Sequence, residues 1–120
     1  MHKVHFYKDK NGNEPVIEYI AELSRKKDKD SRIKLNKISD YIEALRCYGT
    51  QAGEPYVKHL EGEIWELRPL RDRILFVCRV GGSYVLLHQF VKKTQKTPAR
   101  EIEKAKRELA DIIERGLKYE

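Results

Sequence analysis

The chain has 120 residues, of which 37% are charged and 40% hydrophobic, and its formal net charge is +6. This length is typical of a single domain spanning residues 1–120, and the apolar fraction lies well above that of disordered chains. No stretch approaches the ~18 apolar residues of a membrane span, and the first residues lack the apolar region of a signal peptide. Cys47 and Cys78 provide no disulfide framework, so we expect a cytoplasmic protein without a membrane partner.

The N-terminal part is predicted to contain an edge strand, a turn and a helix. Residues 3–8 alternate polar and apolar side chains, and the segment 9–13 is rich in the Asx and Gly residues that favour turns. Over residues 14–27, apolar side chains recur with the i, i+4, i+7 spacing of a half-buried helix. Asn13 stands where the N-cap of this helix is expected.

A second helix and then a group of strands are predicted next. Residues 31–48 carry one apolar stripe, and Gly49 stands directly after it, as is typical of a helix end. The two helices therefore indicate an antiparallel hairpin. Short apolar runs separated by turn residues predict strands, which we place at 57–60, 64–69, 73–80 and 84–92.

The last helix is predicted to begin after Thr97, as N-cap, with Pro98 at its first position, and to end at Gly116. Because the strands are grouped between helices, the order predicts an α+β fold. We expect the N-terminal strand and the helical hairpin to pack on a small curved antiparallel sheet, with the last helix added. Since helices should cover one face, the other face should stay open.

Strand alternation indicates which side chains face the core and which the open face. In the strand 64–69, Trp65 and Leu67 are expected in the core, which leaves Glu66 and Arg68 on the open side. In the next strand the wholly apolar alternate set is the better core candidate, and it consists of Ile74, Phe76, Cys78 and Val80.

Positive charge is concentrated in residues 56–100. This segment holds nine Lys/Arg and four Asp/Glu, so it carries +5 of the net charge of +6. Lys and Arg bind phosphates with release of counterions, so this concentration indicates a surface for a polyanion. The charge alone does not distinguish binding from cleavage, or from neither.

Three segments resemble the RelE/ParE superfamily of bacterial toxins, and within it the HigB-like branch, many of whose members are found in phages. They are K-H-L-x-G-x-x-W-E-L-R at 58–68, R-I-L-F at 73–76 and L-L-H-x-F-x-K-K-T-x-K-T-P at 86–98. The resemblance implies a RelE-like toxin held inactive by a cognate helix-turn-helix antitoxin of the HigA type, with operator DNA bound through that complex. Active members cleave messenger RNA on the ribosome by attack of the 2′-hydroxyl on the adjacent phosphate, without a metal or other cofactor.

The resemblance also implies roles for individual residues. Arg68 and Arg73 match the sheet arginines of the family, which suit a phosphate clamp because arginine binds phosphate in a bidentate manner and keeps its charge. Some members carry a tyrosine or histidine near the chain end as acid or base, and the segment K-K-T-Q-K-T-P at 92–98 has neither at the corresponding point. Glu66 on the arginine face is our first candidate instead; His59, His88, a lysine or the ribosome are the alternatives. The predicted catalytic residues are Arg68, Arg73, Glu66 and Lys93, and the predicted RNA-binding residues are Lys58, His59, Arg79, His88, Lys92 and Lys96.

Other interpretations stay open at this point. The ParE branch inhibits DNA gyrase without catalysis on the same fold, and an RNA-binding module without turnover would explain the absent acid or base. The basic cluster at the end of the last strand favours RNA cleavage over gyrase inhibition. Arg68 and Arg73 could also be surface salt-bridge partners of Glu66 and Asp72, and His88 could be a core histidine.

Overall fold

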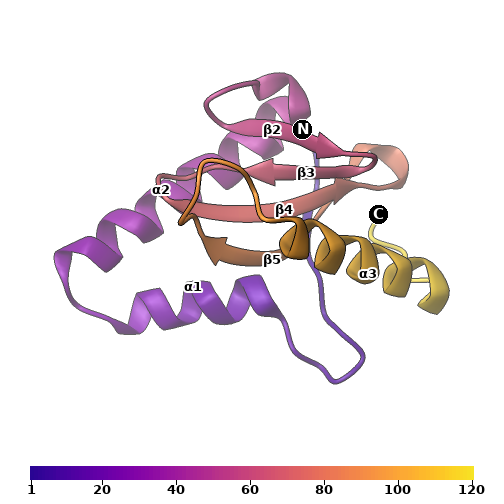
Figure 1. Ribbon diagram of the computed structural model, residues 1–120, viewed down its shortest axis with the longest axis horizontal. Coiled ribbons are helices and arrows are strands. Elements are labelled where there is room, and N and C mark those ends of the chain that lie inside the picture. The colour runs from indigo at the N-terminus through magenta and orange to yellow at the C-terminus, as the bar shows by residue number, and fades with distance from the viewer.

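The computed structural model describes residues 1–120 and has an α+β fold, which confirms the predicted fold class (Figure 1). The strands are β1 (Val4–Phe6), β2 (Val57–Glu61), β3 (Ile64–Leu67), β4 (Asp72–Cys78) and β5 (Tyr84–Val91). The helices are α1 (Pro15–Arg25), α2 (Lys29–Tyr48) and α3 (Ala99–Arg115), with the short 3-10 turns η1 (Gly49–Ala52) and η2 (Val80–Gly82). None of the helices combines the length and the hydrophobicity needed to cross a membrane.

The sheet is mixed, which corrects the prediction of a purely antiparallel one. Its strand order is β1-β5-β4-β3-β2, and the neighbours from β5 to β2 are antiparallel. β1 instead runs parallel to β5, with Val4 opposite Tyr84. Two parallel strands need a long connection between them. Between β1 and β5 this connection consists of α1, α2 and the strands β2 to β4.

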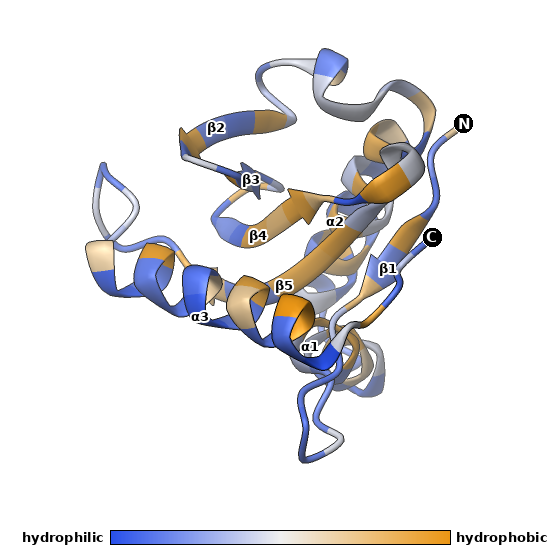
Figure 2. Cartoon of the chain, turned by 90° about the vertical axis from the view of Figure 1, so that its right-hand side faces the viewer, coloured by the Kyte–Doolittle hydropathy of each residue, from blue (hydrophilic) through white to orange (hydrophobic).

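Helices cover both faces of the sheet, which corrects the expectation of one open face. Figure 2 shows β4 and β5, coloured as hydrophobic, between α3 on one side and α2 on the other. Strands covered on both faces are apolar at successive positions, as β4 and β5 largely are. The core on the hairpin face includes Val16, Ile38, Leu67, Ile74 and Phe76, and the core on the α3 face includes Leu75, Val77, Leu87, Leu109 and Ile112.

Two of the predicted core positions of β4 are exposed. Ile74 and Phe76 are fully buried on the hairpin face, as predicted, and Trp65 packs against this core while partly exposed. Cys78 and Val80 were expected in the same set, but both are exposed. The reason is that β4 ends at Cys78, and the chain then leaves the sheet through η2.

The ends predicted for the second and the last helix are correct, whereas the predicted N-caps are not. α2 ends at Tyr48 with Gly49 as its C-cap, and a Cβ added to this glycine would lie only 2.6 Å from the hydroxyl of Tyr84. The N-cap positions of α1 and α3 are Glu14 and Pro98, and neither makes a side-chain cap bond. The pair Thr97-Pro98 therefore predicted the start of α3 to within two residues. The Thr97 hydroxyl, however, does not cap the helix but donates a hydrogen bond to Glu66.

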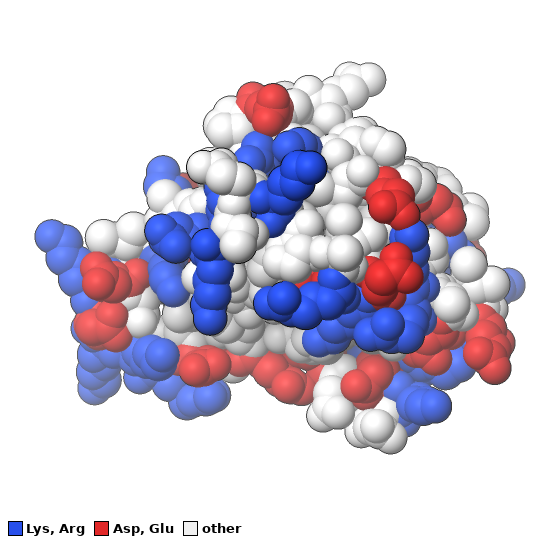
Figure 3. Space-filling view, viewed as in Figure 1, with Lys and Arg blue, Asp and Glu red and all other residues white.

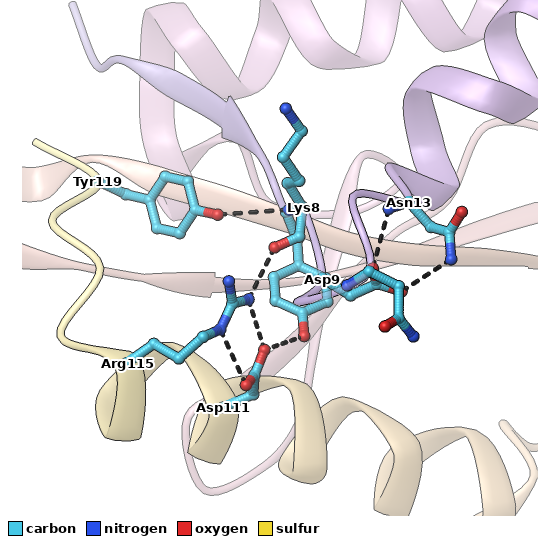
Figure 4. Close-up of polar contacts among 8 residues, drawn as sticks. Lys8, Asp9, Asn13, Asp111, Arg115 and Tyr119 are labelled. Carbon is cyan, nitrogen blue, oxygen red and sulfur yellow. Dashed lines mark hydrogen bonds and ion pairs between the residues drawn. The ribbon is translucent and has the colours of Figure 1, made fainter.

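The C-terminal end of α3 is fastened to the segment after β1 (Figure 4). The hydroxyl of Tyr7 donates a hydrogen bond to the carboxylate of Asp111, which also pairs with Arg115 Nη2 at 2.6 Å. Arg115 Nη2 donates to the carbonyl oxygen of Lys8 at 2.8 Å, and the Lys8 amide donates to the Tyr119 hydroxyl at 3.3 Å. These contacts join residues about a hundred positions apart and hold α3 against the sheet.

We expect the protein to lose stability as the pH falls through the acid range. Hydrogen bonds from Arg115 and then Tyr7 hold the pKa of Asp111 below its ordinary value, and the Asn13 backbone amide lowers the pKa of Asp9. These carboxylates bind protons more readily in the unfolded chain. Their stabilisation is therefore complete above the ordinary pKa of about 4 and is lost as the pH falls through the lower folded pKa.

Thermal melts between about pH 7 and about pH 3 measure this loss. The variant Asp111→Asn should lose less stability over that interval than the parent, because its side chain no longer titrates. An equal loss in both proteins would show that the contacts of Asp111 do not contribute to acid stability.

Candidate active site

A groove of about 240 Å³ opens on the α3 face of the sheet, beside the start of α3. We call it the basic groove; it is lined by Lys58, His59, Leu60, Glu66, Arg68, Arg73, Phe90, Lys92, Gln95, Lys96, Thr97 and Ile102. Figure 3 shows the face of Figure 1, where blue Lys and Arg side chains gather over the strands and the loop before α3. The fold thus collects most of the predicted site residues from β2, β3, β4 and the segment after β5 in one depression.

Glu66 lies in the basic groove in contact with both predicted arginines. Its side chain is 3% exposed, and its Oε2 is 3.4 Å from Arg68 Nε and 3.9 Å from Arg73 Nε. Its other oxygen, Oε1, accepts a hydrogen bond from Thr97 Oγ1 at 2.6 Å. Lys58 stands directly opposite Glu66 in the register of β2 and β3. One carboxylate therefore stands within reach of two guanidinium groups, as strand alternation predicted for Arg68.

Arg68 has a donor that its own chain leaves unsatisfied. Its Nη1 donates to Glu54 Oε1 at 2.9 Å, but the Glu54 side chain is 71% exposed, so this ion pair is weakened by water. Its Nε is buried and has no hydrogen-bond partner, because the contact with Glu66 lacks the required alignment. A buried N–H without a partner is unfavourable.

Arg73 is held in place by backbone carbonyl groups. Its side chain is 7% exposed, and its Nη1 donates to the carbonyl oxygens of Leu70 at 2.9 Å and Asp72 at 2.8 Å. Burial lowers the pKa of Arg73, and the carboxylate of Glu66 opposes that shift. Arginine starts so far above neutral pH that the group stays charged. A guanidinium fixed in this way needs little reorganisation when negative charge develops beside it.

The two carboxylates considered as salt-bridge partners of the arginines behave differently. Glu66 contacts both arginines, as described. The buried Asp72 instead accepts hydrogen bonds at its Oδ1 from the Tyr19 hydroxyl at 2.8 Å and Gln89 Nε2 at 2.9 Å. Burial and this carboxylate raise the pKa of Tyr19. Asp72 therefore serves the contact between α1 and the sheet.

The lysines after β5 divide between two neighbouring depressions. Lys92 and Lys96, which are predicted to contact RNA, line the basic groove. Lys93, predicted as catalytic, lines an adjacent hollow, which it shares with Lys92 and Arg73. Successive residues of an extended segment point in opposite directions, which separates Lys93 from the groove.

His59 lies at the rim of the basic groove with its ring already engaged. Its Nε2 lies 2.7 Å from the carbonyl oxygen of Gly62, to which it can donate. The ring also packs on Trp65, with 4.9 Å between the ring centroids. An imidazole bonded to a backbone carbonyl is less free to exchange a proton with a substrate, so Glu66 remains the better-placed acid or base.

Two predicted RNA-binding residues are not brought to the groove. His88 is 1% exposed, and its ring nitrogens face Glu108 Oε1 at 2.5 Å and Glu101 Oε1 at 3.0 Å, so it links β5 to α3. Arg79 follows the far end of β4, beside Val80 and the C-terminal residues. His88 is buried because α3 covers the face assumed to be open, and Arg79 lies apart from the groove because β4 carries it to the other end of the sheet.

Sequence reasoning missed two polar groups of the site. The Thr97 hydroxyl, predicted to cap α3, donates a hydrogen bond to Glu66 instead. The carboxylate of Glu54, for which the sequence predicts no role, accepts a hydrogen bond from Arg68. Thr97 lies within the segment 86–98 that carries the resemblance, which was the available signal. Glu54 comes from the loop before β2, and nothing in its local sequence indicates where that loop folds.

Comparison with models of known protein families gives a match. A family model described as "Phage derived protein Gp49-like (DUF891)" matches residues 18–110, more than half of the chain. The matched span includes every residue that lines the basic groove. No curated protein matches the chain.

Proposed function

Because this chain belongs to the Gp49-like family of phage-derived proteins, a RelE-like toxin family, we propose that it is the toxin of a type II toxin–antitoxin pair and cleaves messenger RNA on the ribosome. The observation that carries this proposal is the meeting of Arg68 and Arg73 at Glu66 inside the basic groove. Its partner would be a helix-turn-helix antitoxin of the HigA type, through which the complex would bind operator DNA. The resemblance of the segment 58–98 to the HigB-like branch supports this partner.

The proposed reaction is an in-line attack within one RNA strand. A bond forms between the 2′-oxygen and phosphorus while the bond from phosphorus to the 5′-oxygen breaks. A base takes the 2′-hydroxyl proton, and an acid supplies a proton to the departing 5′-oxygen. The products are a 2′,3′-cyclic phosphate, which water can open to a 3′-phosphate, and a 5′-hydroxyl end.

Each step has a candidate residue in the basic groove. Arg68 and Arg73 would bind the non-bridging phosphate oxygens and stabilise the charge that develops there, as preorganised donors do. Glu66 would accept the 2′-hydroxyl proton, with Thr97 orienting its carboxylate. Lys92 and Lys96, which line the same groove, would neutralise the departing oxygen. The positive charge that divalent ions provide in other nucleases would come here from these side chains, so we expect cleavage in the presence of EDTA.

The proposal predicts both the cellular effect and the chemistry of the product ends. Induced expression should arrest growth and create new 5′ ends inside translated messages, which transcript 5′-end mapping detects. Purified toxin on programmed ribosomes, treated with EDTA, should leave 5′-hydroxyl ends together with 2′,3′-cyclic or 3′-phosphate ends. Co-expression with a cognate helix-turn-helix antitoxin should restore growth.

Other outcomes would overturn parts of this proposal. Products with 5′-phosphate and 3′-hydroxyl ends would exclude attack by the 2′-hydroxyl. Growth arrest with intact messages and accumulated DNA breaks would indicate a gyrase inhibitor of the ParE type. RNA binding without new 5′ ends in the transcripts would indicate an RNA-binding module that does not cleave its ligand.

A further inference from the structure

A second depression adjoins the basic groove, between the turn before β4 and the segment after β5, and has a volume of about 440 Å³. We propose that this depression, which we call the Leu70 hollow, binds the next nucleotide of the RNA strand, its phosphate through Arg71 and Lys93 and its base against Leu70. The inference rests on the proposed function for the identity of the ligand, a single-stranded RNA. Arg73 and Lys92 line both depressions, so one strand can pass from one to the other.

The positive charge of the Leu70 hollow favours the binding of an anion. Arg71, Arg73, Lys92 and Lys93 line it, and no carboxylate does. Arg71, Lys92 and Lys93 form no ion pair within the chain. The basic groove differs because Glu66 neutralises part of its charge. Like charges gathered without a counterion repel one another, and a bound phosphate removes that repulsion.

Backbone hydrogen bonds hold the Leu70 hollow in shape. The Lys92 amide donates to the Arg71 carbonyl oxygen at 2.7 Å, and Arg71 Nη2 donates to the Lys92 carbonyl oxygen at 3.0 Å. The turn before β4 is thereby joined to the end of β5. Arg73 Nη1 donates to the Leu70 carbonyl oxygen, which connects the proposed catalytic arginine to the same turn. Arg71 keeps further N–H groups free for a ligand, because a guanidinium has five.

Leu70 occupies a conformation that leucine rarely adopts. Its φ is +57°, and it is the one non-glycine residue of the chain with a positive φ. The residue is 48% exposed and belongs to neither hydrophobic cluster, so packing does not explain why a leucine stands there. Unfavourable backbone conformations of this kind are concentrated at functional sites. An apolar side chain beside cations suits an unstacked base whose phosphate those cations hold.

The test measures binding of a fully 2′-O-methylated single-stranded oligoribonucleotide, which cannot undergo 2′-hydroxyl attack, by fluorescence anisotropy from low to high salt. For Arg71→Ala, the slope of log Kd against log salt should fall by about 0.7, the value for one phosphate contact in single strands. Leu70→Gly should weaken binding roughly 3- to 10-fold at an unchanged slope, because covering half of a leucine is worth part of its full burial. Its melting temperature should stay close to that of the parent, since glycine accepts a positive φ.

Two further variants complete the design. Arg32→Ala removes the same charge from the exposed surface of α2 and should leave binding unchanged, whereas Arg68→Ala tests the basic groove itself. If Arg71→Ala and Leu70→Gly bind like Arg32→Ala while Arg68→Ala binds weakly, the inference is wrong and the proposed function stands. A drop of several degrees in the melting temperature of Leu70→Gly would make Leu70 a packing residue and also overturn it.

The remaining outcomes separate the inference from the proposed function. If the variants of the Leu70 hollow weaken binding as expected but the parent protein does not cleave RNA on ribosomes, the inference holds and the proposed function fails. If the parent protein binds no oligoribonucleotide even at low salt, the Leu70 hollow is not an RNA subsite.

Discussion

Replacement of Arg68 or Arg73 by alanine is expected to slow RNA cleavage roughly 10²–10³-fold, the usual effect of losing one preorganised donor in a transition state. Growth arrest should then be relieved at equal expression. Arg68 is paired with Glu54 at 2.9 Å and lies 3.4 Å from Glu66, and Arg73 donates to two backbone carbonyl groups. Both side chains are therefore positioned before the substrate binds.

Lysine variants separate the role of charge from that of geometry. Arg68→Lys and Arg73→Lys keep a positive charge but cannot bind a phosphate in a bidentate manner, so most of the loss in rate should persist. Arg73 is nearly buried, so its variants need a melting curve to show that the fold survives. Single-turnover cleavage on programmed ribosomes is the measurement, with Arg32→Ala as the charge-matched control. Parental rates in both alanine variants would show that these arginines do not clamp the phosphate.

The variant Glu66→Gln is expected to lower the cleavage rate roughly 10²–10⁴-fold if Glu66 transfers the proton. Glutamine keeps the shape of the side chain and can still accept the hydrogen bond from Thr97, but it cannot ionise. If Glu66 only orients the arginines, the same substitution should cost much less in rate.

Glu63→Gln is the matched control for this experiment, because Glu63 lies exposed in the turn between β2 and β3. It should cleave at the parental rate. A near-parental rate for Glu66→Gln would remove Glu66 from proton transfer and leave it as a positioning residue for Arg68 and Arg73. His59 would be the next residue to test, although its Nε2 already faces the Gly62 carbonyl group.

The sequence by itself determined the secondary structure and the chemical character of this protein. The apolar stripe over 31–48, the glycine after it and the short apolar runs between 57 and 92 all correspond to elements of the structure. The alternation of side chains along β3 predicted that Leu67 and Glu66 face opposite sides of the sheet. Leu67 lies in the core of the hairpin face, and Glu66 lines the basic groove. These features depend on periodicity and turn residues within a few positions, and such local patterns can be read without knowing the rest of the fold.

Only the tertiary structure decided which of these residues meet. It placed β1 parallel to β5 and α3 over the second face of the sheet, which buried His88 between two glutamates. It also brought Thr97 to Glu66 across 31 positions of sequence and set Leu70 beside the basic groove. Contacts of this kind form between segments that are distant in sequence and pack on the same apolar surface. The spacing of apolar residues within one segment shows which of its faces is buried, but not which other segment packs on that face.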